Sequence, residues 1–243
     1  MKRVLIATEK PFAPLAVDQI TEIFATTGLE VQKLEKYSSK SELLEAVKDA
    51  DAIIVRSDIV DREVLDAAKN LKVVVRAGAG FDNLDLASCT AKNIVAMNTP
   101  GQNSNAVAEL TIGMMIFMSR GQFKGGAGSE LKGKTVGIYG CGNIGRRVAR
   151  IAQGLGMRVV ALDPCITKVS MDPYDVKVVQ SVEELFSASD FLSLHIPSNE
   201  KTKNSINFTL LNKMPKSGML INTARKEVID EEGLKQMFEM RPD

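Results

Sequence analysis

The chain has 243 residues, which is enough for one large domain or two modest ones. Its 31 lysines and arginines nearly balance its 30 aspartates and glutamates, so the charge does not suggest a basic surface for nucleic acid. Apolar residues at 44 % and charged residues at 25 % are typical of a globular protein and exclude wholesale disorder.

Cysteine usage and the N-terminal residues indicate a soluble, cytoplasmic protein. Three cysteines cannot all pair and none has metal-ligand spacing, so we expect reduced thiols and no metal site. The apolar run of residues 4–7 stops at Thr8, short of the about 7 to 15 residues of a secretory signal. The most apolar stretch, residues 110–118, is about half as long as a membrane span. We therefore expect no targeting segment and no contact with a membrane.

The first part of the chain alternates short β-rich runs with helical patterns. Strands are predicted at residues 4–7, 30–34, 52–55 and 73–75. Helices are predicted between them at residues 15–24, 39–47 and 61–69. The helix at 39–47 opens with capping-box spacing from Ser39 to Glu42. Buried strands separated by helices predict a parallel sheet covered on both faces.

A punctuated segment separates this part from the next. Residues 76–83 are rich in glycine and turn formers, and Pro100 and Gly101 follow Asn98, which predicts a domain crossing there. Residues 105–119 are then predicted to be helical. The second half of this helix is apolar on nearly every face, so we expect it to be buried, with its methionines in core packing. Residues 120–134 contain five glycines, which predicts a loop.

The second part repeats the alternation of strands and helices. Strands are predicted at residues 135–139, 158–162, 177–179, 191–196 and 219–222. Helices are predicted at residues 144–154, from Ser181 onward, at 210–214, and at 230–238 with Asp230 as the cap. The fold class predicted for the whole chain is therefore α/β, with two doubly wound parallel sheets.

The strongest motif is G-x-G-x-x-G from Gly140 to Gly145, directly after a predicted strand and at the start of a predicted helix. Gly140 permits a tight turn, Gly142 has no side chain to keep a pyrophosphate from the backbone, and Gly145 lets helix and strand pack closely. The first N–H groups of the helix, beginning at Asn143, then face the phosphates.

The predicted second strand of this part ends at Asp163, eighteen residues after Gly145, close to the spacing expected for a ribose-binding acid. Its carboxylate accepts hydrogen bonds from the adenosine 2′- and 3′-hydroxyls and repels a 2′-phosphate. The motif and this acid together predict binding of NAD in preference to NADP.

Several ordered motifs resemble the D-isomer-specific 2-hydroxyacid dehydrogenases. They lie in the second part at residues 140–145, 163, 194–197 and 221–225. In the first part, residues 56–57, 76–83, 98–101 and 108–110 look most like the D-3-phosphoglycerate dehydrogenase branch of that family. The resemblance covers nearly the whole chain.

The resemblance implies a two-domain enzyme with its substrate in the cleft. Residues 1–98 would form a flavodoxin-like substrate domain, and residues 99–243 a Rossmann NAD-binding domain that is incomplete at its C-terminal end. It also implies a homodimer or higher homo-oligomer. The implied reaction is NAD-dependent oxidation of 3-phosphoglycerate to 3-phosphohydroxypyruvate, at the start of serine synthesis.

The resemblance also assigns roles to individual residues. Arg225 matches the catalytic arginine, which grips the substrate carboxylate and polarises the C2 oxygen. The cofactor-binding positions matched are Gly140, Gly142, Asn143, Ile144, Gly145, Asp163, His195, Ile196, Pro197, Thr223 and Ala224. The substrate-binding positions matched are Arg56, Ser57, Ala79, Gly80 and Asn103. Arg76 adds positive charge to the site or forms a structural salt bridge.

The chain departs from the family in three places. His195 is the only histidine, but it matches a packed or cofactor-lining position and not the acid/base. The family's histidine–glutamate pair lies on segments after the last predicted helix, so we expect the chain to be shorter than the natural product. Lys226 and Glu227 replace glycines after the catalytic arginine, and the loop at 120–134 is shorter than the usual dimer arm.

Two other functions remain open at this point. A glyoxylate or hydroxypyruvate reductase uses the same fold, and so do co-repressors that bind NAD without catalysis. The pair Arg56 and Ser57 favours a phosphorylated substrate, whereas the missing acid/base favours a binding protein.

Overall fold

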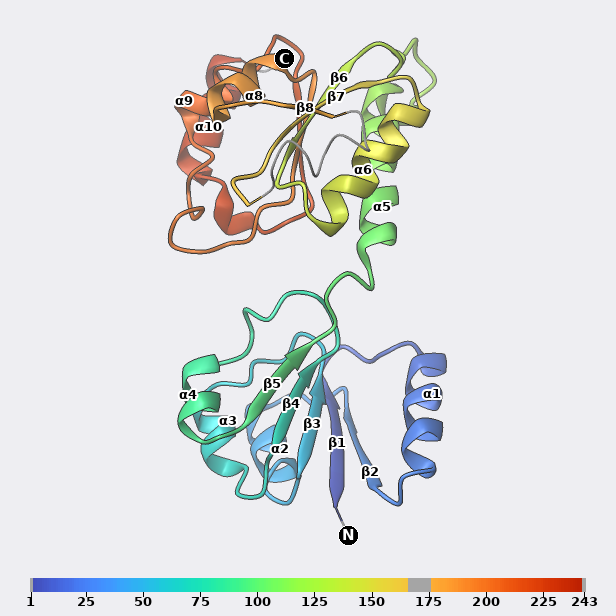
Figure 1. The fold of residues 1–243 in the computed structure, drawn as a ribbon, viewed down its shortest axis with the longest axis vertical. Helices are drawn as coiled ribbons and strands as arrows, with labels where there is room; N and C mark the ends of the chain where they lie inside the picture. The colour runs from blue at the N-terminus through green and yellow to red at the C-terminus, as the bar shows by residue number, and fades with distance from the viewer. Residues whose placement is uncertain (1, 166–175, 242–243) are drawn as a thin grey trace. The chain divides into compact units, whose positions relative to one another are not determined.

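A computed structural model describes residues 2–165 and 176–241 of the chain. The chain divides into two compact units, Met1–Asn103 and Ser104–Asp243 (Figure 1). Within the described residues, no helix combines the length and the apolar character needed to span a bilayer.

The first unit is built on a five-stranded parallel sheet. Its strands are β1 (Arg3–Thr8), β2 (Glu30–Glu35), β3 (Ala52–Val55), β4 (Val73–Arg76) and β5 (Val95–Asn98). They lie in the order β2-β1-β3-β4-β5, which is the flavodoxin-like order with its switch point between β1 and β3. Leu5 and Ile53 are fully buried neighbours in this sheet.

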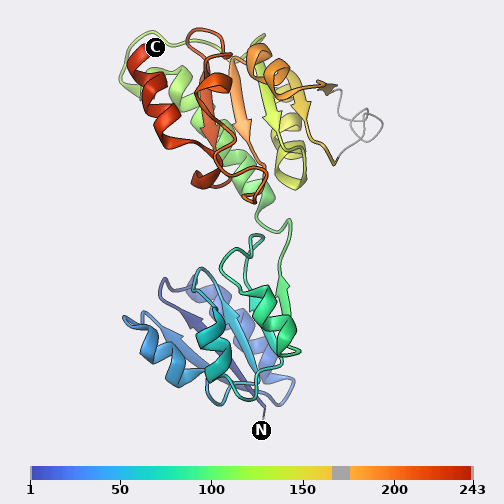
Figure 2. The same cartoon turned by 90° about the vertical axis from the view of Figure 1, so that its left-hand side faces the viewer.

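Helices cover both faces of this sheet (Figures 1 and 2). They are α1 (Pro14–Ala25), α2 (Lys40–Ala46), α3 (Arg62–Ala67) and α4 (Leu86–Ala91). Ile20 and Phe24 of α1 pack with Val4 and Ile6 on one face. The other three helices cover the opposite face, where apolar side chains of β1 and β3 form the larger core.

The second unit contains another five-stranded parallel sheet. Its strands are β6 (Thr135–Tyr139), β7 (Arg158–Leu162), β8 (Lys177–Val178), β9 (Phe191–Leu194) and β10 (Met219–Asn222). Their order is β10-β9-β6-β7-β8, so the chain reverses its direction of travel between β6 and β9. This is the strand order of the dinucleotide-binding folds, and it confirms the predicted α/β class.

Helices also flank the described part of this sheet (Figure 2). They are α5 (Ser104–Ser119), α6 (Asn143–Gly154), α8 (Val182–Ala188), α9 (Phe208–Leu211) and α10 (Glu231–Met240). Met115 of α5 and Val148 of α6 pack with Val136 of β6 on one face. Phe186 of α8 and Leu211 of α9 pack with Leu192 of β9 on the other.

The structure corrects several predicted elements. The segment around Asn83 to Asn98 contains α4 and β5, which the sequence pattern did not indicate. Strand β9 ends at Leu194 instead of continuing to Ile196, and α9 begins at Phe208, before the predicted residue 210. Asp230 occupies the N-cap position of α10, yet its side chain makes no capping hydrogen bond there with any described residue.

The expected burial of the second half of α5 is wrong for most of its apolar side chains. Ala108, Ile112 and Met115 are buried against the sheet, as a core helix requires. Leu110, however, is 58 % exposed and Phe117 is 41 % exposed. This helix therefore has one apolar face turned toward its own sheet and another turned away from it.

Candidate active site

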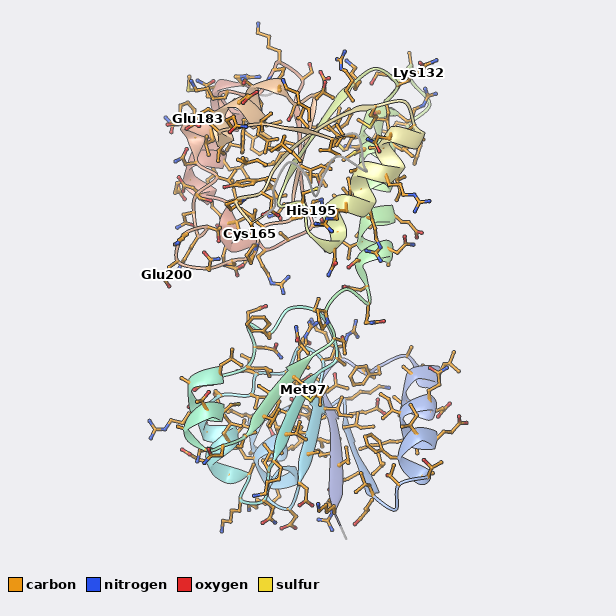
Figure 3. All side chains as sticks on the ribbon, viewed as in Figure 1. Met97, Lys132, Cys165, Glu183, His195 and Glu200 are labelled. Atoms are coloured by element: carbon orange, nitrogen blue, oxygen red, sulfur yellow. The ribbon has the colours of Figure 1, made fainter. Side chains whose placement is uncertain are left out.

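The predicted cofactor residues gather at the carboxyl edge of the second sheet. The glycine-rich turn follows β6, Asp163 follows β7, His195 follows β9 and Thr223 follows β10. Strands β6 and β9 are neighbours at the switch point, where open α/β sheets bind ligands. Figure 3 shows His195 and Cys165 at one end of this unit and Lys132 at the other.

The turn after β6 passes so close to β9 that only glycine fits its first position. Gly140 has a φ of +90°, and a Cβ added to it would lie 2.8 Å from the carbonyl carbon of His195. A Cβ on Gly145 would lie 2.5 Å from the carbonyl oxygen of Gly140. These two glycines thus bring the first turn of α6 directly onto the ends of β6 and β9.

Gly142, in contrast, has open space where a side chain would be. No described protein atom lies within 4 Å of a Cβ built there, and its φ is −77°. Gly142 is also the N-cap of α6, and no side chain of a described residue caps that end. The first N–H groups of the helix, at Asn143 and Ile144, are left for an anion. The site therefore fits a pyrophosphate, which needs both the space and the donors.

Asp163 is fixed to the glycine-rich turn by its own carboxylate. Its Oδ2 accepts the backbone N–H of Cys141 at 2.8 Å, and its Oδ1 accepts that of Cys165 at 2.8 Å. Each carboxylate oxygen keeps lone-pair capacity for a second hydrogen bond, such as one from a ribose hydroxyl. The Cys141 thiol is buried, and this burial, with the Asp163 charge, raises its pKa to about 12. The thiol is therefore protonated at neutral pH.

His195 directly follows β9 in the chain and is partly buried. Its backbone N–H donates to the Tyr139 carbonyl at 2.7 Å, and its Nε2 lies 2.8 Å from Ser193 Oγ. Its Nδ1 lies 3.4 Å from Thr223 Oγ1. Burial lowers the pKa of the imidazole to about 4, so it is neutral at physiological pH. Ile196, which follows it, is buried, and Pro197 is exposed.

The loop after β10 carries Arg225 and is braced by Asn222. The Asn222 side chain accepts the Ala224 N–H at 2.9 Å and donates to the Arg225 carbonyl at 2.8 Å. One guanidinium nitrogen of Arg225 donates to the Ala224 carbonyl at 3.0 Å. This partly buried arginine thus lies on the loop after β10, at the same sheet edge as the glycine-rich turn.

The first unit has its own polar edge at the ends of β1, β2 and β3. Ser57 lines a cavity of about 310 Å³ there, together with Glu9, Tyr37 and Asp58. The buried Asp58 carboxylate accepts the Tyr37 hydroxyl at 2.7 Å, the Glu9 N–H at 2.7 Å and the Arg56 N–H at 3.3 Å. Asp58 therefore fixes the loop that holds Arg56 and Ser57.

The remaining substrate-binding candidates of this unit lie on two other loops. Ala79 and Gly80 follow β4, and the Ala79 carbonyl accepts the Asn98 side chain at 2.7 Å. Asn103 is exposed at the end of the unit. The structure thus gathers the candidates of the second unit at one sheet edge, whereas Arg56, Ser57, Ala79, Gly80 and Asn103 belong to the first unit.

Some supporting residues went unnoticed in the sequence. Asn222 lies within the motif at residues 221–225 and Ser193 lies just before the motif at 194–197. Both are polar residues in otherwise apolar strands, and this contrast is the sequence signal that points to them. Asp58 comes three residues after the buried strand β3. Thr111 lies in an apolar helix, and its contact with Thr223 at 3.3 Å depends on a fold that local patterns do not reveal.

A doubly wound sheet with a glycine-rich turn at its switch point defines a dinucleotide-binding protein. The profile described as "D-isomer specific 2-hydroxyacid dehydrogenase, NAD binding domain" matches residues 107–241. The solved NAD⁺-bound 3-phosphoglycerate dehydrogenase of Entamoeba histolytica is 49 % identical, with a TM-score of 0.93, covering 99 % of this chain and 78 % of that one. The chain belongs to the D-isomer-specific 2-hydroxyacid dehydrogenase family and carries its NAD-binding domain.

Two curated relatives are similar over most of this chain. The D-3-phosphoglycerate dehydrogenase of Methanocaldococcus jannaschii is 37 % identical over 90 % of this chain, which spans 43 % of that protein. The hydroxypyruvate reductase of Thermotoga maritima is 37 % identical over 84 % of this chain and 70 % of its own length. The chain thus spans less than half of the first relative and about two thirds of the second.

The depressed pKa of His195 predicts how the stability of the protein depends on pH. The unfolded chain binds a proton at the ordinary pKa of 6.5, whereas the folded chain does so only at about 4. The contribution of neutral His195 to the free energy of unfolding is therefore complete above pH 6.5. It is lost as the pH falls toward 4, at about 1.4 kcal/mol per pH unit. Urea titrations at pH 8, 6 and 5 measure this loss.

His195→Asn is the control, because it lacks the titrating group and keeps every other carboxylate and amine. The free energies of unfolding of the two proteins should converge as the pH falls. Parallel curves between pH 6.5 and 5 would show that the imidazole does not titrate differently in the folded chain.

Proposed function

We propose that the protein is an NAD-dependent dehydrogenase that oxidises 3-phosphoglycerate at C2 to 3-phosphohydroxypyruvate, at the start of serine synthesis. The observation that carries the proposal is the open space at Gly142, at the uncapped start of α6 and next to the carboxylate of Asp163. The E. histolytica structure, which contains NAD⁺, is similar over 99 % of this chain and supports the choice of cofactor.

The second unit would hold NAD along the carboxyl edge of its own sheet. The N–H groups of Asn143 and Ile144 face the pyrophosphate, and Asp163 accepts the ribose hydroxyls. His195, Ile196, Pro197, Thr223 and Ala224 line the remaining length toward the nicotinamide. When bound, NAD supplies the acceptor for the hydride that leaves C2. A 2′-phosphate would meet the Asp163 carboxylate, which favours NAD over NADP.

Arg225 would bind and orient the hydroxy acid. Its guanidinium can donate two parallel hydrogen bonds to the substrate carboxylate, which fixes the C2–H bond in one direction. The positive charge also stabilises negative charge that develops on the C2 oxygen as the carbonyl forms. Asn222 supports this role because its side chain bonds the backbone of both Ala224 and Arg225.

The first unit would bind the rest of the substrate, as a substrate domain. Arg56 and Ser57 are exposed neighbours on a loop that the Asp58 carboxylate bonds at the Arg56 N–H, so a cation and a hydroxyl are available to a phosphate. Ala79 and Gly80 expose backbone on the neighbouring loop, and Asn103 adds a polar side chain. This chemistry suits a phosphorylated hydroxy acid better than an unphosphorylated one.

A reductase of hydroxypyruvate is the second candidate. The relative with that name in T. maritima is 37 % identical and is covered over 70 % of its length. The same residues serve a reaction in the opposite direction, and the presence or absence of a phosphate on the preferred substrate separates the two candidates.

The protein would act as a homodimer or a higher homo-oligomer. Leu110, Met114 and Phe117 recur at helical spacing on the outward face of α5, and the ring of Phe123 packs edge-on against Phe117 at 5.5 Å. An apolar stripe of this kind on a helix whose other face already fills the core is typical of a subunit interface.

Gly142→Ala should weaken NAD binding without destabilising the protein. The added methyl group meets no described protein atom, but it occupies the space assigned to the pyrophosphate. We expect the Kd for NAD to rise about tenfold or more, measured by calorimetry, with an unchanged melting temperature.

Gly154→Ala is the matched control, because it also meets open space but lies at the other end of the same helix. It should bind NAD as the wild type does, and NADP should bind the wild type more weakly than NAD. Wild-type affinity in Gly142→Ala would refute the placement of the pyrophosphate.

Arg225→Ala should lower kcat with 3-phosphoglycerate by about 10² to 10³, as expected for the loss of a donor to a developing oxyanion. Arg225→Lys keeps the positive charge but not the planar guanidinium, so its kcat should lie between that of the wild type and that of Arg225→Ala. The rate of NADH formation at alkaline pH, with NAD supplied, gives the kcat of the wild type and of both variants. Arg62→Ala is the control, because Arg62 is an exposed arginine of α3.

The same assay with glycerate in place of 3-phosphoglycerate tests the phosphate contact. We expect a much lower kcat/KM on glycerate. Equal turnover of the two acids would contradict the role proposed for Arg56 and Ser57.

Leu110→Glu should break the proposed homo-oligomer. A carboxylate on this face would lose its hydration in a subunit contact, which is costly for an unpaired charge. Light scattering should then show a monomer at concentrations where the wild type is associated. Ile23→Glu is the control, because Ile23 is 65 % exposed on α1 and belongs to the first unit. A monomeric wild type would refute the assembly.

A further inference from the structure

Four side chains form a continuous series of polar contacts beneath the loop that carries Arg225. Ser193 Oγ lies 2.8 Å from His195 Nε2, and His195 Nδ1 lies 3.4 Å from Thr223 Oγ1. Thr223 Oγ1 in turn lies 3.3 Å from Thr111 Oγ1. The series therefore joins the ends of β9 and β10 to helix α5 through the imidazole of His195.

The position of each proton in this series follows from its last member. Thr111 donates its only hydroxyl proton to the Val107 carbonyl at 2.8 Å, so its oxygen is the acceptor toward Thr223. Thr223 thereby uses its own single proton, and it must accept from His195. The Nδ1 of the imidazole therefore carries the hydrogen.

The other ring nitrogen completes the assignment. Burial keeps the imidazole neutral, so a hydrogen on Nδ1 leaves a lone pair on Nε2. The Ser193 hydroxyl, which is fully buried, donates to that lone pair. Every hydrogen bond then runs in one direction, from Ser193 through His195 and Thr223 to Thr111.

We infer that His195, in its Nδ1–H form, is a positioning residue that holds Thr223 and the loop leading to Arg225 at the carboxyl end of β10. The catalytic consequence rests on the function proposed for Arg225. Asn222 braces this loop from within, at Ala224 and Arg225, whereas His195 fixes its first residue to the neighbouring strand. Without the bond from Nδ1, the Thr223 hydroxyl keeps its contact with Thr111 of α5.

The hydrogen on Nδ1 can be observed directly, because His195 is the only histidine of the chain. A nitrogen NMR spectrum of the full-length protein, labelled in histidine, contains the signals of one imidazole and needs no assignment. We expect a protonated signal for Nδ1 and an unprotonated signal for Nε2 at pH 7. The opposite pattern, or a mixture of the two, would overturn the inference.

Two substitutions separate the two hydrogen bonds of the imidazole. In His195→Asn the amide nitrogen takes the place of Nδ1 and still donates to Thr223. In His195→Gln the amide lies near the place of Nε2, so the contact with Ser193 is kept and the one with Thr223 is lost. Ser193→Ala is the matched control, since it removes only the bond to Nε2.

The loop itself supplies a readout that is independent of activity. We expect hydrogen exchange at residues 221–226 to speed up in His195→Gln and to stay at the wild-type rate in His195→Asn and Ser193→Ala. His195→Asn and Ser193→Ala should instead lower the melting temperature. Each removes one partner of the buried bond between Ser193 Oγ and His195 Nε2 and leaves the other partner without it. Equal loop exchange in all four proteins would refute the positioning role.

Kinetics then test whether the position of the loop matters for catalysis. His195→Gln should lower kcat by about 10-fold to 100-fold, and His195→Asn should restore kcat to within about fivefold. Both variants lack the imidazole that lines the proposed NAD site, so their KM values for NAD should be similar to each other. A His195→Gln enzyme with wild-type kcat would refute the catalytic consequence. If the wild type turns over no hydroxy acid while the loop responds as expected, the proposed function fails and the positioning role stands.

Discussion

The site of the second unit depends on one close approach between two pieces of backbone. Gly140 passes the end of β9 with no room for a Cβ, and the His195 N–H donates to the Tyr139 carbonyl at 2.7 Å. The close approach of Gly140 to β9 sets where the turn ends and therefore where α6 begins. Because the helix starts directly over the switch point, its unpaired N–H groups face the same edge of the sheet as Asp163 and Arg225.

Much of this arrangement could be predicted from local patterns. The strand, glycine-rich turn and helix at residues 135–154 and the acid at Asp163 follow from spacing and backbone sterics, which act over a few residues. Strand β10 was predicted with its observed ends, because its apolar run stops at a polar residue. The roles of Arg225 and of the first-unit loops came from the family resemblance alone, and they remain proposals.

What the sequence did not reveal has physical reasons. Helix α4 has six residues and β5 has four, with Val95 and Met97 exposed, so neither produces a clear periodic pattern. Thr111 and Thr223 meet only because α5 packs against the second sheet, and the separation of 112 residues hides such a pair from any local pattern. The apolar second half of α5 was expected to be buried between layers or domains, yet composition cannot distinguish a face that packs in a core from one that contacts a partner.

The double role of Asp163 constrains how coenzyme preference can change. Its carboxylate is the proposed ribose acceptor, and it is also the acceptor for the backbone N–H groups of Cys141 and Cys165. Exchanging it for a neutral residue to admit a phosphorylated ribose would release the turn that the diphosphate needs. A route to NADP use, in evolution or in the laboratory, therefore has to supply a replacement acceptor for the Cys141 amide in the same step.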